Sequence, residues 1–416
     1  MTTNGHAEKT TPPMRYHRVF LESIGYELAP IVIETPALER RLMPFLNEHG
    51  FPLPRLDLLT GIAERRWWEP NHRLSDGATA AARKAIERSG IAGKDIGTLI
   101  YAGVCREQYE PATACAVASN LGLKPQIVMD VSNACLGVLN GVVQVANQIE
   151  LGQCKAGLVV SCESAREIND ATIDRLNSAA SSLTRAEAEA LYRECLATLT
   201  GGSGAVAVLV TGEDSSRLHR RKLLGGNSMS APEHNGLCSW GLQSVQESAL
   251  GRLLQKGVPQ AVGTVLGQKA AVMMEWGIRF GIHTLEHGAR TLDDGLQHVK
   301  LPFMKTHAGE VLRNGVELAL RNWLVFLESL GCRDHHIDKV ICHQVGSANR
   351  DAVLKTLGID RAKDYSTYEH LGNIGTVSLP MTAAIAEERD FLKQGDKVGL
   401  LGIGSGLNCM MLGVEW

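Results

Sequence analysis

A helix that is apolar on nearly every side is the strongest constraint on the fold of this chain. The segment Leu136–Ile149 (LGVLNGVVQVANQI) has almost no polar face. A helix without a solvent face is stable only when other parts of the protein cover it all round. We therefore expect this helix to lie in the middle of the molecule.

Short apolar strands alternate with helices on both sides of this segment. In the first half, the pattern predicts strands at 96–104, 126–131, 156–161 and 204–210, and a polar helical segment at about 167–199. In the second half, it predicts strands at 337–342, 397–401 and 409–414, and helices that open at 352 and 379. Continuous apolar strands between helices indicate buried sheets of parallel or mixed type.

Two similar segments suggest an internal duplication. KAGLVVSCES and DKVGLLGIGS are both apolar strands that run into a loop of small residues. We expect two α/β halves, 14–215 and 216–416, packed about a pseudo-twofold axis. Residues at about 241–303 fit this duplication poorly and form an insertion in the second half. Glu–Arg pairs at i,i+4 favour a partly helical insertion, although its glycines weaken that prediction.

Composition excludes several classes of protein. The formal net charge of the 416 residues is −3 and no strongly basic block occurs, which argues against a nucleic-acid surface. No segment reaches the roughly 18 apolar residues of a spanning helix, so we expect no integral membrane segment. The polar start of the chain does not resemble a signal peptide. Ten cysteines without a CxxC pair indicate thiols in a reducing, cytoplasmic location.

A cysteine lies just before the apolar helix, in the segment DVSNACLG. Cys135 falls between a strand end and a helix start, where the free N–H groups and the dipole of the helix stabilise a thiolate. We therefore expect a lowered pKa for this thiol and a nucleophilic role. Its small neighbours, Ala134 and Gly137, leave room for a substrate carbonyl. The alternative is a small apolar cysteine of the core.

A histidine, His343, follows the predicted strand at 337–342. Since α/β folds place ligands at the carboxyl ends of strands, His343 is a candidate site residue; a surface histidine is the alternative. Nearby residues also raise the alternative of a zinc site: Cys332, His335, His336 and Cys342. Their spacing matches no regular structural site, and adjacent residues of a strand point to opposite faces. We therefore exclude zinc.

Two further segments contribute candidates. EHLGNIGTVSLP is a loop that leads into a helix, where the amide of Asn373 can donate to a developing oxyanion; a cap or turn role is the alternative. GIGSGLN, residues 402–408, lacks the GxGxxG spacing of a dinucleotide loop and precedes a strand instead of a helix. We expect a tight turn that presents backbone N–H groups to an oxyanion.

Together these segments resemble the ketosynthase III branch of the thiolase superfamily. The similar motifs are NACLG around Cys135, CHQ at His343, HLGNIGTVSLP around Asn373 and GIGSGLN near the C-terminus. The resemblance covers roughly residues 17–240 and 304–416. It implies an α/β thiolase fold, in which two similar halves form a five-layered αβαβα core with an insertion in the second half.

Within that branch the chain is most similar to the OleA type, the acyl-CoA condensing enzymes of head-to-head hydrocarbon (olefin) biosynthesis. The similar segments are TGIAERRWW, YEPATA, LLGIGSGLNC and the final tryptophan. Two departures from ordinary ketosynthase III agree with this choice. The HQAN motif appears as HQVG, and Leu59 replaces the arginine that precedes TGI and helps to hold a phosphopantetheine carrier.

A third departure concerns Glu110, which stands where ordinary ketosynthase III has an aromatic residue before its proline. A decarboxylating enzyme makes its carbanion by losing CO2, whereas two simple acyl-CoAs require a base at the α-carbon. The resemblance implies that Glu110 is this base and that it reaches the site from the other subunit of a homodimer. A solvated loop glutamate is the alternative.

The resemblance implies a complete reaction. Cys135 takes the first acyl group, and the backbone N–H groups of Cys135 and Gly406 hold the oxyanion. His343 and Asn373 hold the second thioester, and Glu110 removes its α-proton. The product is a 2-alkyl-3-ketoacyl thioester or the β-keto acid. The expected substrates are acyl-CoAs, no metal or redox cofactor is expected, and downstream hydrocarbon-pathway enzymes are expected partners.

Several alternatives stay open at this point. A decarboxylative 3-oxoacyl-ACP synthase III-like condensation with malonyl thioester, or acyl transfer, is the nearest one. An HMG-CoA-synthase-like enzyme also combines Glu, Cys and His, but the Asn373 segment favours the ketosynthase branch. A non-condensing acyl-binding or scaffold subunit is the alternative from another class. The insertion permits an acyl tunnel, a docking site for a downstream enzyme or a membrane contact.

Overall fold

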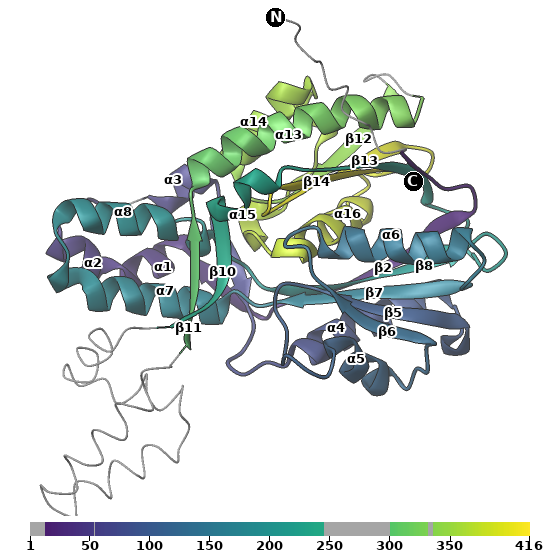
Figure 1. The fold of residues 1–416 in the computed structure, drawn as a ribbon, viewed down its shortest axis with the longest axis horizontal. Helices are drawn as coiled ribbons and strands as arrows, with labels where there is room; N and C mark the ends of the chain where they lie inside the picture. The colour runs from purple at the N-terminus through teal and green to yellow at the C-terminus, as the bar shows by residue number, and fades with distance from the viewer. Residues whose placement is uncertain (1–12, 54, 245–299, 332–335) are drawn as a thin grey trace, which may run out of the picture.

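The computed structural model describes residues 13–53, 55–244, 300–331 and 336–416. Its elements are stacked in five layers, helix, sheet, helix, sheet, helix (Figure 1). The outer helices are α4 (Leu74–Ser89) and α5 (Thr113–Leu121) on one side, and α13 (Ala308–Ser329) and α14 (Ser347–Leu357) on the other. The middle layer holds α6 (Gly137–Glu150) and α16 (Ser378–Glu388). This layering confirms the predicted αβαβα core.

The strands of the first half follow one another in space in the order β2, β8, β7, β5, β6. Their bounds are β2 Val19–Leu28, β8 Gly204–Gly212, β7 Ala156–Glu163, β5 Ile96–Ala102 and β6 Ile127–Val131. β5 pairs in parallel with both β6 and β7, and β8 pairs antiparallel with β2 and β7. The sheet is therefore mixed, one of the two types that the apolar strands predicted.

The strands of the second half follow in the order β12, β13, β14, β9. Their bounds are β12 Lys339–Cys342, β13 Lys397–Gly404, β14 Asn408–Glu415 and β9 Lys222–Ser230. β12 and β13 are parallel, whereas β14 is antiparallel to both of its neighbours. A single pair of residues, Phe20 and Lys222, joins β9 to β2. The division of the chain at 215/216 stays a prediction.

Helix α6 lies where its apolar sequence predicts, between the two sheets (Figure 1). Val138, Val142 and Val145 are at most 2% exposed, and burial of each such side chain stabilises the fold by roughly 1.5–3 kcal/mol. Its contact with β7 is very close: a Cβ added at Gly141 would lie 2.6 Å from Val159 Cγ1. This close approach fixes the position of α6 against β7.

Two helical predictions require correction. Helix α14 begins at Ser347, not at 352, because its polar first turn gains a tertiary partner that periodicity cannot reveal: Arg350 pairs with the buried Asp364. The helical segment at 167–199 is two helices, α7 (Arg166–Ala179) and α8 (Arg185–Cys195). Thr184 starts the second of them with a capping box, since its side chain and that of Glu187 satisfy each other's backbone N–H groups.

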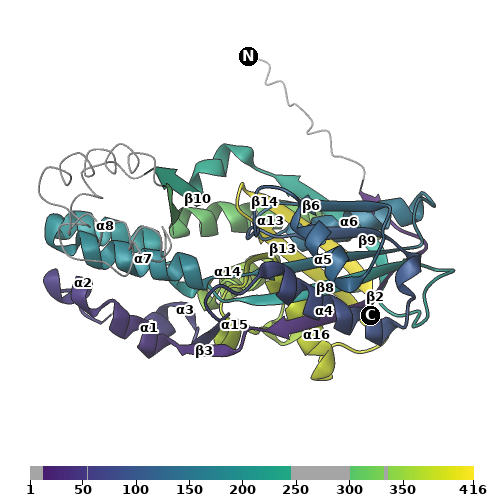
Figure 2. The same cartoon turned by 90° about the horizontal axis from the view of Figure 1, so that it is seen from below.

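A smaller lobe flanks the layered core (Figures 1 and 2). It contains α7 and α8 together with β3 (Ile31–Glu34), α1 (Thr35–Arg41), α2 (Met43–Glu48), α3 (Leu56–Thr60) and β4 (Glu64–Trp67). Beside it, β10 (Cys238–Ser244) and β11 (Lys300–Thr306) form an antiparallel pair, and β11 contacts α7 and α8. These strands lie at the two ends of the predicted insertion, and the partly helical structure predicted for its interior falls on residues outside the described ones.

Among the described helices, none combines the length and the apolar character that crossing a bilayer requires.

Candidate active site

A largely apolar cavity of about 150 Å³ lies between the two halves and contains three of the predicted site residues. Cys135 comes from the first half, and His343 and Asn373 come from the second. Most of the remaining wall is apolar and is contributed by α13, α14 and the ends of β13 and β14, including Val311, Leu312, Gly315, Val316, Ala319, Val353, Leu401, Ile403, Leu407 and Met411. The three predicted residues therefore line one cavity in the structure.

The local backbone brings Cys135 to the cavity at the start of α6. The preceding residue, Ala134, has a φ of 44°, a left-handed conformation that turns the chain sharply between β6 and α6. The first amides of the helix already have partners. Leu136 N donates to Asn133 O at 2.9 Å, and Val138 N donates to Thr376 Oγ1 at 2.7 Å.

The predicted lowering of the Cys135 pKa is wrong. Burial raises the pKa of this thiol to about 12, and the nearby Cys238 and Glu163 add to the rise. The prediction assumed free N–H groups at the helix start, but Asn133 and Thr376 have taken them up. Cys135 therefore rests as a neutral thiol.

His343 directly follows β12, and its backbone N–H donates to Leu401 O of β13 at 3.0 Å. Burial lowers the pKa of His343 to about 4, and its Nδ1 atom has no hydrogen-bond partner. A neutral imidazole has one N–H donor and one free lone pair. His343 can thus either accept a proton from a thiol or donate a hydrogen bond to a carbonyl oxygen.

Asn373 lies in the loop between α15 (Tyr368–Leu371) and α16. Its backbone is held on both sides, since Asn373 N donates to Thr200 O and Gly202 N donates to Asn373 O, each at 2.9 Å. Its side-chain oxygen accepts from Gly375 N at 3.0 Å. This contact fixes the orientation of the amide and leaves the Nδ2 group as a donor for a ligand in the cavity.

Gly406 lies in the turn between β13 and β14, with a φ of 134° that favours glycine. Its neighbours Ser405 and Leu407 line the cavity, whereas Gly406 is not among the lining residues. Gly404 lies closer to the nucleophile: a Cβ built on it would be 3.4 Å from Cys135 N. The role of Gly406 as an oxyanion donor stays a prediction.

Glu110 does not join the other candidates within one protomer. It is exposed in the loop between β5 and α5, next to Tyr109, which is 90% exposed, and it does not line the cavity. The sequence analysis expects Glu110 to act from a second subunit, so this position leaves the prediction open.

Glu163 lies near the site without lining the cavity, and sequence reasoning missed it. It ends β7, is 3% exposed, and accepts hydrogen bonds from Val104 N at 2.9 Å and Cys105 N at 3.1 Å. Burial raises the pKa of its carboxyl. Its position stabilises the loop that leads to Glu110, and its charge opposes thiolate formation at Cys135. A glutamate that ends an otherwise apolar strand was the available signal.

Sequence relatives cover nearly the whole chain. Residues 68–220 match the thiolase N-terminal domain family, and residues 327–416 match the 3-oxoacyl-[acyl-carrier-protein] synthase III C-terminal family. An acyl-CoA:acyl-CoA alkyltransferase of Shewanella oneidensis is 45% identical over 408 residues, which are 97% of this chain and 100% of that protein. The enzyme of the same name from Xanthomonas campestris is 31% identical over 405 residues, with 97% and 100% covered. A β-ketoacyl-[acyl-carrier-protein] synthase III of Clostridium tetani is 25% identical, with the same coverage.

Solved structures with the same fold include several of Xanthomonas campestris OleA. A cysteine-to-serine variant with bound lauric acid and lauroyl-CoA has a TM-score of 0.77 and 29% identity, and covers 96% of this chain and 100% of that one. A glutamate-to-alanine variant has the same TM-score and identity, with 97% and 99% covered. Sequence, fold and the meeting of Cys135, His343 and Asn373 agree: this chain belongs to the thiolase superfamily, in the OleA family of acyl-CoA:acyl-CoA alkyltransferases.

Proposed function

We propose that this protein joins two fatty acyl-CoAs by a non-decarboxylative Claisen condensation, through an acyl-cysteine intermediate. The observation that carries the proposal is the apolar cavity that Cys135, His343 and Asn373 line together. Family membership supports the choice of two acyl-CoAs over malonyl thioester. The chemistry needs no metal or redox cofactor.

The first half-reaction transfers one acyl group to Cys135. Because the thiol and the imidazole both rest neutral, the sulfur attacks the thioester carbonyl as its proton passes to the free nitrogen of His343. Backbone N–H groups at Cys135 and Gly406 hold the oxyanion. The tetrahedral intermediate then expels the CoA thiolate, which takes up the proton and leaves as free CoA.

The second half-reaction forms the carbon–carbon bond. The N–H donors of His343 and Asn373 bind the carbonyl oxygen of the second acyl-CoA, which stabilises its enolate. Glu110 of the partner subunit removes the α-proton. The enolate carbon attacks the acyl-cysteine and the Cys135 thiolate leaves, taking the proton back from Glu110. The product is a 2-alkyl-3-ketoacyl-CoA, whose hydrolysis gives the β-keto acid.

We propose further that the active unit is a cytoplasmic homodimer that delivers its product to enzymes of a hydrocarbon pathway. Within the described part of the chain, β6 ends the sheet and has a neighbour on one side only. An unpaired strand edge favours association with another chain. The exposed loop with Tyr109 and Glu110 lies between β5 and α5, and α5 is tied to β6: Asp130 of β6 accepts hydrogen bonds from Thr113 N and Ala114 N. A twofold contact at this edge would bring Glu110 toward the partner's cavity.

Product analysis with saturated acyl-CoAs tests the proposal. Wild-type protein should release free CoA and form the condensed product, which mass spectrometry identifies. Cys135→Ala should abolish the covalent acyl adduct and the product. Glu110→Ala should still form the adduct but should lose roughly 10²–10⁴-fold in condensation, the usual contribution of a general base.

Two outcomes would contradict the proposal. Release of CO2 with malonyl-CoA, in place of condensation of two saturated acyl-CoAs, would establish the decarboxylative alternative. Unchanged condensation by Glu110→Ala would remove this glutamate from the mechanism.

A further inference from the structure

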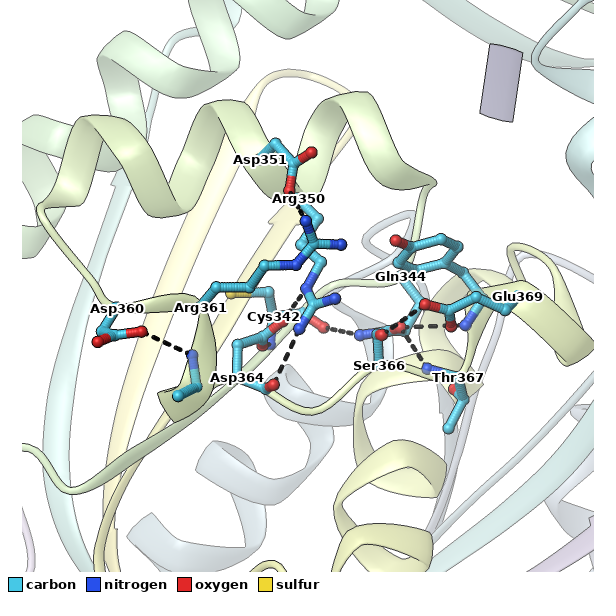
Figure 3. A network of polar contacts seen from close by, with 12 residues as sticks. Cys342, Gln344, Arg350, Asp351, Asp360, Arg361, Asp364, Ser366, Thr367 and Glu369 are labelled. Atoms are coloured by element: carbon cyan, nitrogen blue, oxygen red, sulfur yellow. Dashed lines mark hydrogen bonds and ion pairs between the residues drawn. The ribbon is translucent and has the colours of Figure 1, made fainter. Parts of the chain in front are cut away.

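A polar network contains Cys342 and Gln344, the two sequence neighbours of His343 (Figure 3). At its centre, Arg350 of α14 pairs with Asp364, and the two side chains are 11% and 0% exposed. Arg350 Nε donates to Asp364 Oδ2 at 2.6 Å, and its Nη2 donates to the backbone oxygen of Asp364 at 2.9 Å. This double contact fastens α14 to the segment that follows it.

The same network holds the residues on both sides of His343. Before the histidine, Cys342 N donates to Asp364 Oδ1 at 3.2 Å. After it, the buried Gln344 folds back so that its Nε2 donates to Cys342 O at 2.7 Å. The oxygen of Gln344 accepts from Thr367 N at 2.9 Å and from Tyr368 N at 3.3 Å. Both neighbours of His343 are therefore bonded to the segment 364–368, Cys342 through Asp364 and Gln344 through Thr367 and Tyr368.

The segment 364–368 leads to Asn373, the second side chain that we propose binds the thioester oxygen. Thr367 precedes α15, and Asn373 follows two residues after this short helix. Thr367 Oγ1 also contacts Thr382 Oγ1 of α16 at 2.7 Å. Since Nδ1 of His343 has no hydrogen-bond partner, the orientation of its ring is not fixed by a bond at that atom. The separation of His343 and Asn373 therefore depends on how the backbone around 342–344 is held.

The charge of the pair also matters for the cavity. Arg350 is one of the lining residues, and an uncompensated guanidinium there would disfavour a proton on the neighbouring imidazole. Asp364 neutralises this charge at 2.6 Å. Breaking a buried pair by removing one partner leaves an unpaired charge, whereas removing both charges together avoids this cost.

We propose that Arg350, Asp364 and Gln344 are positioning residues, which act through His343 and Asn373 to align both donors on one thioester oxygen. This inference rests on the proposed condensation. Because carbon–carbon bond formation uses both donors and acylation of Cys135 uses only His343, misalignment should slow condensation more than acylation. A displacement of about 1 Å at a catalytic group can cost about 10²-fold in rate.

The test measures the two half-reactions separately. Rates of Cys135 acylation come from intact-protein mass spectrometry, and rates of condensation come from product analysis, both well below the unfolding temperature. Gln344→Ala and Arg350→Met should each lower the rate of condensation about 10–100-fold. The loss in the rate of acylation should be at least severalfold smaller. The double variant Arg350→Met/Asp364→Asn, which removes both charges and keeps an acceptor for Cys342 N, should recover most of the loss seen in Arg350→Met. Gln344→Glu, which keeps the acceptor for Thr367 N, is the milder replacement if Gln344→Ala does not fold.

A matched control is the partly buried pair Arg221–Glu387, which also has a 2.6 Å contact, with side chains 9% and 31% exposed, but lies outside the cavity lining. Arg221→Met should lower the unfolding temperature without changing the ratio of the two rates. Equal losses in both half-reactions, or no loss in either, in the Gln344 and Arg350 variants would overturn the inference. Failure of the proposed function is a different result, because wild-type protein would then not condense acyl-CoAs at all.

Discussion

At the scale of single residues, the reactive sulfur and its neighbouring imidazole are both uncharged at rest. Burial raises the pKa of Cys135 to about 12 and lowers that of His343 to about 4. With this order of pKa values, transfer of a proton from the thiol to the imidazole is unfavourable in the free protein. The nucleophile is therefore generated only as it attacks, which protects the sulfur from other electrophiles.

The pH dependence of Cys135 alkylation follows from this order. Below a pKa of about 12, the thiolate fraction increases about tenfold for each pH unit. The second-order rate of labelling at Cys135 by iodoacetamide should therefore continue to rise from pH 7 to pH 10 without a plateau. Peptide mass spectrometry reads the labelling at Cys135, and the exposed Cys115 serves as an internal control. A plateau near pH 8 would mean that the helix start, and not burial, sets the pKa.

At the scale of elements, α13 limits the volume of the cavity in which we expect the acyl chain to lie. Gly315 faces the cavity from the middle of this helix, and a Cβ there would lie 2.8 Å from Ile403 Cδ1. Both residues line the wall, so any side chain at 315 reduces the cavity or displaces Ile403. A glycine within a helix lowers stability by roughly 0.5–1 kcal/mol relative to alanine. The space that Gly315 leaves for a substrate is a reason for a glycine at this position despite that cost.

We expect Gly315→Val to shift the preference of the enzyme toward shorter acyl-CoAs. The branched side chain projects into the wall of the cavity, so long chains should lose kcat/KM severalfold relative to short chains. The control is Gly309→Ala on the same helix, because a Cβ at 309 meets nothing within 4 Å. This change lies in the first turn of α13 and should leave the chain-length profile unchanged. An unaltered profile for Gly315→Val would show that the acyl chain lies elsewhere.

The elements also show where sequence reasoning succeeds and where it ends. The apolar pattern of α6 and of the strand before His343 predicted the layers and the common location of Cys135, His343 and Asn373, because periodicity reports local burial. The direction of the Cys135 pKa shift was wrong because burial between separate elements raises the pKa of the thiol, and because Thr376, 238 positions away, already satisfies the amide of Val138. The early start of α14 and the polar network around Asp364 likewise depend on contacts between separate elements, which a single sequence does not display.

At the scale of the whole molecule, the described residues of one chain do not place all four proposed catalytic groups in one cavity. Cys135, His343 and Asn373 line this cavity, whereas Glu110 lies on the surface of the same protomer and outside it. Removal of a proton from an α-carbon requires a base within hydrogen-bond reach of that proton, about 3 Å. A second copy of the chain would supply this group if the two β6 edges meet about a twofold axis.

Subunit mixing distinguishes a base in trans from a base in cis. Neither Cys135→Ala nor Glu110→Ala alone should condense acyl-CoAs, because each homodimer lacks one group in every site. When the two variants are unfolded together and refolded, half of the dimers should be mixed, and each mixed dimer should contain one complete site. Condensation should then return to about one quarter of the wild-type rate, as expected for a symmetric dimer with two shared sites. Refolded wild-type protein gives the reference, and intact-mass analysis shows that only the chains that retain Cys135 carry the acyl group. If Glu110 acted within its own chain, no combination of these two variants would restore the product, since every site would still lack either the sulfur or the base.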